Sequence, residues 1–425
     1  MSPITLKTTT VILAGSVLIG CIDESDDTDA IAVNHTPCGP DHAAVFSAPT
    51  LSPEYITALK VTDYVDDNTV ELIENDSITV RGALATTASD YSLISRENHL
   101  FHLGRYQIDT LQKYYVSALN SNSGLYQTDN KLGFSLRDAG QSESTNPYKI
   151  GFINDFTAVI PSYEKNIAWL VNLNAQQESD FKICELDLSE YSTSEVKNAG
   201  TPEENTTSYP PKMFSVNVNE NYAAISMQRL NGYTAVESPY VAIFDLSTWE
   251  EIDTNPAAEG LKGLELSQKN PQHVAQNSDD IFIGSYRYNG EYGCGGGGIE
   301  KVDLENLTVT TVDDSTCYQS LTITENGNLY AVDNHSVAFG DTGSNTLYQI
   351  TDSNKTAVTN FENILIQTIA AHGNDLWYSL PQETNDEGIE TVAAKVGRID
   401  ATLNSEVGNT VNPTLTAREI AFIEK

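Results

Sequence analysis

The 425-residue sequence predicts an all-β fold built from repeated antiparallel units. Apolar and polar residues alternate with a period of two over most of the chain, and no long stretch with the 3.6-residue period of a helix competes with them. A polar turn followed by an apolar or aromatic strand recurs along the chain, which indicates a tight hairpin entering a buried strand. These turns are at residues 97–101, 165–169, 220–224, 278–282, 326–330 and 373–377.

A second repeated signature sets the size of each unit. It is an apolar residue followed by Asp or Thr, and it ends at Asp109, Asp187, Asp245, Asp303, Thr351 and Asp400. The intervals are 78, 58, 58, 48 and 49 residues. Apart from the first, these are the lengths of a four-stranded propeller blade with loop insertions. The sequence therefore predicts a single β-propeller.

Seven blades are the preferred number. Six units lie between about residues 91 and 412, and a seventh forms if the C-terminal run 417–423 pairs with strands from the region 43–80. Such pairing of the N- and C-terminal strands closes the ring and removes exposed strand edges. Eight blades are an alternative, because the long first interval contains another hairpin-like signal at 124–126. Two β-sandwich domains are a further alternative, although no linker divides the chain.

The N-terminal residues have the layout of an export signal, with a single charge at Lys7 and then the apolar run 11–19, which is too short to span a bilayer. The sequence Leu-Ile-Gly-Cys at 18–21 resembles the lipobox of bacterial lipoproteins. That resemblance implies that residues 1–20 are a signal peptide and that Cys21 is acylated, for example with palmitate.

The region after Cys21 is expected to be a solvated tether. Residues 21–41 are rich in Asp and Glu and poor in apolar residues, so we expect the propeller to span residues 42–425. Ile22, and not Asp, directly follows the cysteine. For a lipoprotein this favours the outer membrane, with the protein facing either the periplasm or the cell surface.

The net charge of −36 excludes the basic surface of a nucleic-acid-binding protein. It also argues against electrostatic docking on anionic lipid head groups, so the lipid at Cys21 is the expected membrane contact. An acidic surface is typical of salt-adapted proteins. On such an acidic surface, an exposed Lys or Arg is unusual and is a candidate functional residue.

Four cysteines besides Cys21 are expected to form disulfides, because an even number in an exported chain favours this use. We favour Cys294–Cys317 together with Cys38–Cys184 among the three connectivities. No Cys-x-x-Cys motif or His pair has zinc-ligand spacing, so no cofactor is predicted. A structural calcium ion is an alternative at acidic turns such as 66–68 and 277–280.

The candidate ligand-binding residues lie in loops expected between the second and third strands of blades, where propellers commonly bind ligands near the axis. They are Arg105, Tyr106, Arg229, Tyr233, Arg287, Tyr288, Tyr292 and His335. Arginine with a neighbouring aromatic ring supplies charge, bidentate hydrogen bonds and a stacking surface, which suits an anionic, partly aromatic ligand. The competing interpretation is structural, since Tyr and Arg often finish the ends of β-strands.

The repeat length and hairpin pattern of residues 42–425 resemble bacterial propellers of the YVTN-repeat and surface-layer kind. More loosely, they resemble propeller lipoproteins that accompany outer-membrane siderophore or haem receptors. The resemblance implies capture of a ferric siderophore or haem for a TonB-dependent outer-membrane receptor.

No catalytic residues are predicted, because no Gly-x-Ser-x-Gly or His-Glu-x-x-His motif occurs. A metal-dependent propeller hydrolase or lyase and an envelope interaction scaffold are the alternative functions.

Overall fold

The structure is a computed structural model that describes residues 36–63, 68–85, 88–115, 133–138, 140–201, 203–257, 259–288, 294–333, 344–351, 354–384 and 390–425. They belong to one compact unit, His35–Lys425. The predicted signal peptide, Cys21 and the tether up to residue 35 lie outside the described residues. No helix in the described ranges is long and apolar enough to cross a bilayer.

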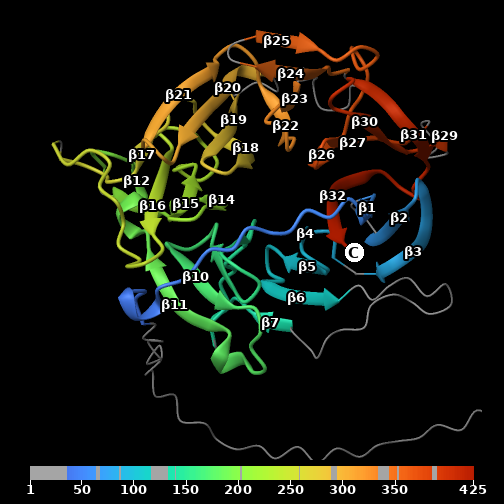
Figure 1. The fold of residues 1–425 in the computed structure, drawn as a ribbon. Coiled ribbons are helices and arrows are strands. Elements are labelled where there is room, and N and C mark those ends of the chain that lie inside the picture. The colour runs from blue at the N-terminus through green and yellow to red at the C-terminus, as the bar shows by residue number, and fades with distance from the viewer. Residues whose placement is uncertain are drawn as a thin grey trace, which may run out of the picture. The chain divides into compact units, whose positions relative to one another are not determined.

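Seven four-stranded antiparallel sheets surround a common axis in the described part of the chain (Figure 1). The predicted all-β propeller with seven blades is therefore confirmed. Blade 1 contains β1 (Tyr55–Thr62), β2 (Asn68–Glu74), β3 (Ser77–Ala85) and β32 (Ala417–Glu424). Blade 2 contains β4 (Tyr91–Arg96), β5 (His99–Gly104), β6 (Thr110–Tyr115) and β7 (Gly133–Ser135). Blade 3 contains β8 (Gly151–Phe152), β9 (Thr157–Pro161), β10 (Ile167–Asn172) and β11 (Lys182–Asp187).

The remaining blades follow in sequence order. Blade 4 contains β14 (Met213–Val218), β15 (Tyr222–Met227), β16 (Tyr240–Asp245) and β17 (Leu264–Glu265). Blade 5 contains β18 (Pro271–Asn277), β19 (Asp280–Tyr288), β20 (Cys294–Asp303) and β21 (Thr308–Asp313). Blade 6 contains β22 (Tyr318–Ile323), β23 (Leu329–Asp333), β24 (Leu347–Thr351) and β25 (Asn354–Ala357). Blade 7 contains β26 (Thr368–His372), β27 (Asp375–Leu380), β30 (Lys395–Asp400) and β31 (Ser405–Val411).

Two ribbons and three short helices complete the described elements. The ribbons pair β12 (Thr193–Lys197) with β13 (Asn205–Tyr209), and β28 (Glu383–Thr384) with β29 (Glu390–Val392). The 3-10 helices are η1 (Pro40–His42), η2 (Glu178–Asp180) and η3 (Ser189–Tyr191).

The two ends of the propeller pair in blade 1. β32 is antiparallel to β1, from Tyr55 opposite Glu424 to Val61 opposite Ala417, and it supplies the innermost strand of that blade. The predicted closure by N- and C-terminal strands is confirmed. The inner edge of β1 is therefore not left unpaired.

Five of the six predicted hairpin turns lie between the first and second strands of their blades. The turn at 165–169 instead enters β10, the third strand of blade 3. The inner strand β8 of that blade is only two residues long, and its turn is closed by the Ile153 amide, which donates to the Thr157 carbonyl. So short a strand has no alternating pattern to read from the sequence.

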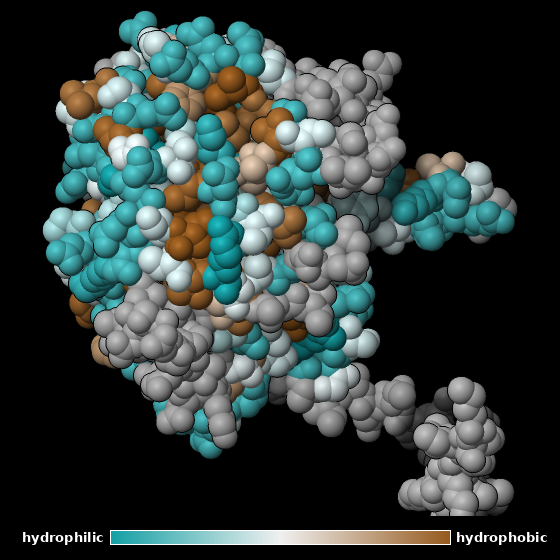
Figure 2. All heavy atoms as spheres, turned by 90° about the vertical axis from the view of Figure 1, so that its right-hand side faces the viewer, coloured by the Kyte–Doolittle hydropathy of each residue, from teal (hydrophilic) through white to brown (hydrophobic). Residues whose placement is uncertain are grey.

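The core lies between the blades because each sheet is covered on both faces by its neighbours. Between blades 2 and 3, for example, Phe101 packs in one buried cluster with Ile160 and Trp169. On the side of the propeller seen in Figure 2, hydrophilic residues dominate and hydrophobic ones gather in narrow stripes. This agrees with the large negative charge of the sequence.

An N-terminal segment, residues 36–54, runs across one end of the axis before β1 begins (Figure 1). We call it the strap. Its start is fixed by the disulfide Cys38–Cys184, which confirms one predicted pair. Cys317 is also disulfide-bonded, but the side chain of Cys294 lies outside the described residues, so that pairing stays a prediction.

The strap is held along its length by several blades. Its Ala44 and Ser47 amides donate to the carbonyls of Leu246 in blade 4 and Ile153 in blade 3. Near β1, the Ser52 amide donates to a carboxylate oxygen of Glu424 at 2.8 Å. We call this end of the propeller the strapped face. The opposite end, where second strands connect to third strands, is the loop face.

Candidate functional site

The loop that carries Arg105 and Tyr106 joins β5 to β6 on the loop face. Gly104 begins it at a crowded point, where a Cβ atom would lie 2.3 Å from Cγ2 of Ile108. Gln107 and Asp109 have positive φ angles of 64° and 49°, so the chain turns sharply before β6. In blades 4, 5 and 7 the corresponding Asp instead ends the third strand.

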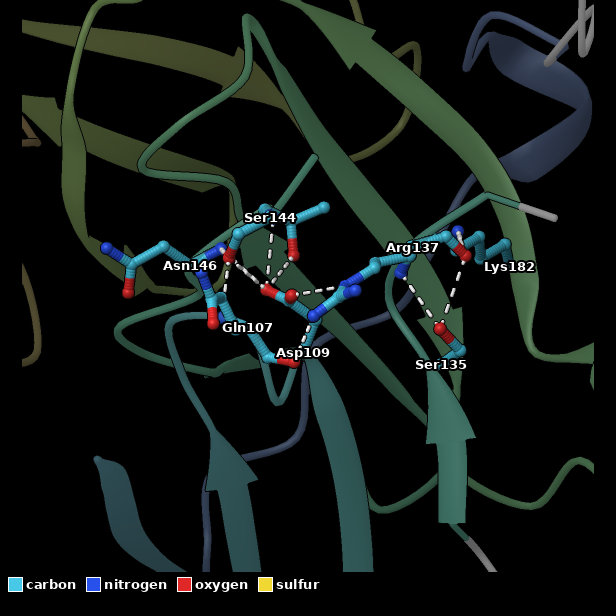
Figure 3. Close-up of polar contacts among 8 residues, drawn as sticks. Gln107, Asp109, Ser135, Arg137, Ser144, Asn146 and Lys182 are labelled. Carbon is cyan, nitrogen blue, oxygen red and sulfur yellow. Dashed lines mark hydrogen bonds and ion pairs between the residues drawn. The ribbon is translucent and has the colours of Figure 1, made fainter. Parts of the chain in front are cut away.

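The carboxylate of Asp109 connects the end of this loop to residues 137–146 (Figure 3). Asp109 is 0% exposed, and its Oδ1 accepts hydrogen bonds from the hydroxyl of Ser144 at 2.8 Å and the amide of Asn146 at 2.8 Å. Its Oδ2 accepts from Nε of Arg137 at 2.6 Å. A buried carboxylate with a charged partner and several donors is fully compensated. The cluster thus positions the backbone next to Arg105.

The guanidinium of Arg105 lies flat against an aromatic ring. Its Cζ is 3.6 Å from the centre of the Tyr148 ring, and its Nε is 3.3 Å from Oδ1 of Asp90. The neighbouring Tyr106 is 52% exposed. Stacking holds the guanidinium plane in place while part of its donor fork remains available to a ligand.

A second tyrosine extends this aromatic surface toward blade 4. The rings of Tyr148 and Tyr163 are 4.7 Å apart, and Nζ of Lys212 lies 4.9 Å from the centre of the Tyr163 ring. The Tyr163 hydroxyl donates to Oε1 of Gln228 at 2.7 Å. Burial raises the pKa of Tyr163, and the neighbouring Tyr148, Glu164 and Tyr233 add to the effect. The hydroxyl therefore stays protonated and acts as a donor.

A cavity of about 320 Å³ lies beside Arg105, near the loop-face end of the inner strands. Three cations, two carboxylates and two neutral polar side chains line it, namely Lys60, Arg105, Arg418, Asp90, Glu419, Ser89 and Gln367. Nζ of Lys60 is 3.2 Å from Oε1 of Glu419, and Arg418 donates to Gln367. The lining therefore carries a formal excess of positive charge in a strongly acidic protein.

These contacts define a site of Arg105, Tyr148, Tyr163, Lys212, Gln228 and the small cavity, which we call the Arg105 site. No protein-family model and no characterised protein matches the sequence. A 6-phosphogluconolactonase-like protein from Bacteroides fragilis has a similar structure, with a TM-score of 0.53 at 10% identity, covering 89% of this chain and 100% of that one. A protein from Lactobacillus plantarum has a TM-score of 0.51 at 12% identity, covering 87% and 99%. At such identities these similarities show the propeller fold alone.

The predicted residues divide into three groups. Arg105, Tyr106 and Tyr233 lie on the loop face around the Arg105 site, and Tyr233 is 93% exposed. The guanidinium of Arg229 bonds to backbone groups instead. Its Nε donates to the Tyr191 carbonyl at 3.1 Å and its Nη1 to the Ser238 carbonyl at 3.0 Å. The side chains of Arg287 and Tyr288, and all of Tyr292 and His335, lie outside the described residues.

Sequence reasoning missed Tyr148, Tyr163, Lys212 and Lys60. Three of them lie outside loops between second and third strands: Tyr148 and Lys212 in the links that enter β8 and β14, and Lys60 within β1. Tyr163 lies in the short connection between β9 and β10, just before the predicted turn at 165–169. A sequence signal that could have found these residues is a Tyr or Lys next to an inner strand of a blade. Among the described residues, no group of three or more His, Cys, Asp and Glu could hold a metal ion.

Proposed function

We propose that this propeller is a binding protein that captures an anionic, partly aromatic ligand on its loop face. The observation that carries the proposal is the Arg105 guanidinium, stacked at 3.6 Å on Tyr148 and next to a cavity that Lys60 and Arg418 also line. Stacked arginine binds planar carboxylates and aromatic anions through both charge and ring contact. Tyr106 and Tyr233 offer further exposed rings.

The favoured ligands are a ferric catecholate siderophore and haem, which combine negative charge with aromatic rings. We further propose that the chain is a lipoprotein anchored through Cys21 in the outer membrane and that it passes its ligand to a TonB-dependent receptor. The cavity of about 320 Å³ accommodates one anionic group and not a whole chelate. The rest of the ligand would therefore lie over Tyr148 and Tyr163.

Fluorescence titration of the purified protein tests the ligand proposal. Ferric catecholates, ferric hydroxamates and haem are added while quenching of Trp169, Trp249 and Trp377 is followed. We expect saturable binding of a catecholate or haem, weakened about tenfold by Arg105→Gln, which removes one charge-assisted contact. Lys395→Gln removes the same charge from an exposed position of blade 7 and is expected to bind normally.

No saturation with any of these ligands would overturn the proposal. Metal-dependent loss of a lactone or uronide substrate would support a propeller hydrolase or lyase instead. Co-purification of an envelope protein without ligand binding would support an interaction scaffold.

Metabolic labelling tests the anchor separately. Cells expressing the chain are fed radiolabelled palmitate, and we expect label in the wild type and none in Cys21→Ala. Label that persists in the variant, or no label in either, would contradict acylation at this residue.

A further inference from the structure

A larger cavity opens on the strapped face, at the other end of the inner strands from the Arg105 site. Its volume is about 980 Å³. Its walls come from β14 and β18, from the turns that follow these strands, and from strap residues Phe46 and Leu51. The strap crosses this end of the axis in Figure 1, so it forms one side of the cavity. The cavity is part of neither the Arg105 site nor the proposed function.

One cation inside this cavity is uncompensated. Lys149, just before β8, lines the cavity and is an exposed residue, and within the described residues it makes no hydrogen bond or ion pair. His273 on β18 is close to it: burial first, and then the charge of Lys149, lower the pKa of His273 to about 4. The imidazole is therefore neutral at pH 7 and does not interact with an anion as a second charge.

Acidic residues lie at the mouth of the same cavity. Glu220 and Asp279 belong to the turns that follow β14 and β18, and Glu305 to the turn between β20 and β21. Lys149 comes directly after Tyr148, which belongs to the Arg105 site at the other face. Arg96 also lines this cavity, but its guanidinium is already paired with Asp155 at 2.9 Å. Lys149 is therefore the lining cation left for a ligand, and it precedes β8, whereas the carboxylates belong to turns of the strapped face.

The polar wall of this cavity is held by hydrogen bonds, and one of its donors has no acceptor among the described residues. Gln276 uses both N–H groups on the carbonyls of Val218 and Ser278, and its Oε1 accepts from Nδ2 of Asn217 at 3.1 Å. The amide of Asn217 has two N–H groups, and in the described part of the chain the second has no acceptor. Phe46 and Phe152 supply apolar surface beside it.

We propose that this cavity binds a short zwitterionic peptide. The peptide carboxylate pairs with Lys149, its ammonium group lies among the carboxylates of the mouth, and its carbonyl accepts the free N–H of Asn217. An apolar side chain packs against Phe46 and Phe152. A purely anionic ligand would have to pass Glu220, Asp279 and Glu305, whereas a zwitterion matches both ends.

Calorimetry with three forms of one dipeptide tests this pairing. The probes are Phe-Leu, its C-terminal amide and its N-acetyl derivative. We expect Phe-Leu to bind and its amide to bind about tenfold more weakly. The acetyl form is expected to lose less affinity than the amide, because the mouth of the cavity is exposed to solvent and salt. The affinity of Lys149→Gln for Phe-Leu is expected to be about tenfold lower than that of the wild type, and no higher than its affinity for the amide.

Matched variants separate this proposal from the Arg105 site. Lys149→Arg keeps the charge and is expected to retain binding, and Lys395→Gln controls for the net charge. Arg105→Gln is expected to leave peptide binding unchanged, so failure at one face is distinguishable from failure at the other. Absence of Phe-Leu binding to the wild type, or equal affinity in folded Lys149→Gln, would overturn the proposal.

Discussion

The two faces of the propeller use arginine in different ways. On the strapped face, Arg96 is 7% exposed, and it donates to a carboxylate oxygen of Asp155 at 2.9 Å and to the Ser47 carbonyl at 2.7 Å. On the loop face, Arg105 stacks on Tyr148, and among the described residues its carboxylate partner is Asp90. The first arginine holds the strap in place, whereas the second is the one that we propose binds a ligand.

The comparison shows that the contacts of an arginine side chain indicate its role, whereas the class of loop that carries it does not. Arg229 lies in the predicted class of loop but resembles Arg96, since it donates to two backbone carbonyls. We therefore expect Arg229 to contribute chiefly to folding. The following experiments compare the two faces, from the largest expected effect to the smallest.

Asp109→Ala is expected to have the largest effect on the loop face. It leaves Arg137 and the amide of Asn146 without their buried acceptor, which costs about 3–5 kcal/mol of the free energy of unfolding. Urea denaturation measures this loss. Asp187→Ala, at an exposed position, is the control and is expected to change stability by less than about 1 kcal/mol. A loss that small in Asp109→Ala would show that the loop does not depend on this carboxylate.

Replacing both Cys38 and Cys184 by Ser tests the strapped face. This disulfide closes a loop with a sequence separation of 146 residues, and its removal is expected to cost about 3 kcal/mol. Thermal unfolding of the wild type and the double variant without reductant gives the value, because reductant would also open the disulfide of Cys317. Ligand binding at the Arg105 site is expected to survive. If binding were lost together with the disulfide, the two faces would not be independent.

Acid is expected to destabilise the fold through His102, which lies near the loop face. His102 is 5% exposed and stacks on Tyr91, and burial is the main reason that its pKa is lowered to about 4. The unfolded chain takes up this proton near pH 6.5 and the folded chain only near pH 4, so stability falls as the pH is lowered between them. The expected loss between pH 6.5 and 5 is about 2 kcal/mol.

The control for this pH effect is His102→Gln, which cannot take up the proton. Urea denaturation at each pH is expected to show a shallower decline in the variant, although His273, with a similarly lowered pKa, keeps part of the slope. A buried histidine of the strapped face, His372, differs from His102 because it has a carboxylate neighbour: its Nε2 is 3.0 Å from a Glu424 oxygen. An identical decline in the wild type and His102→Gln would exclude His102 as a source of acid sensitivity.

The smallest effect on stability is expected from Arg105→Lys. The change keeps the charge but removes the planar stacking on Tyr148, which is worth about 0.5–1 kcal/mol at a partly exposed site. Affinity for an aromatic anion is expected to fall severalfold in the fluorescence titration. Arg96→Lys is the matched change on the strapped face, and it is expected to lower stability more and binding less. The reverse order would contradict the roles assigned to the two arginines.

The repeats carry most of the information about the fold, because period-two alternation and hairpin turns are local properties of a strand. They were sufficient to predict seven blades and the pairing of residues 417–423 with an N-terminal strand. They failed at β8, where two paired residues give no pattern. The Cys38–Cys184 pair was predicted by elimination, once Cys294 and Cys317 were paired as neighbouring-strand residues, and nothing in the sequence indicated that it fixes a strap.

The candidate site was predicted only in part, because its residues come from blades 1 to 4 and from the links between blades. Arg105 was found since it follows a strand next to a tyrosine. The ring against which it stacks, Tyr148, is 43 positions further along the chain, and Lys60 reaches the cavity from β1. Such neighbours are set by tertiary packing, which a local pattern does not contain.

The pairing of β1 with β32 also governs how the chain can be made. Synthesis proceeds from the N-terminus, so β1 emerges long before the strand that completes its sheet. Until residues 417–424 arrive, blade 1 presents a bare strand edge to any other chain nearby. A chain truncated just before this segment would lose the strand pairing that closes the propeller, and not merely one strand. A chain truncated at this point is therefore expected to aggregate.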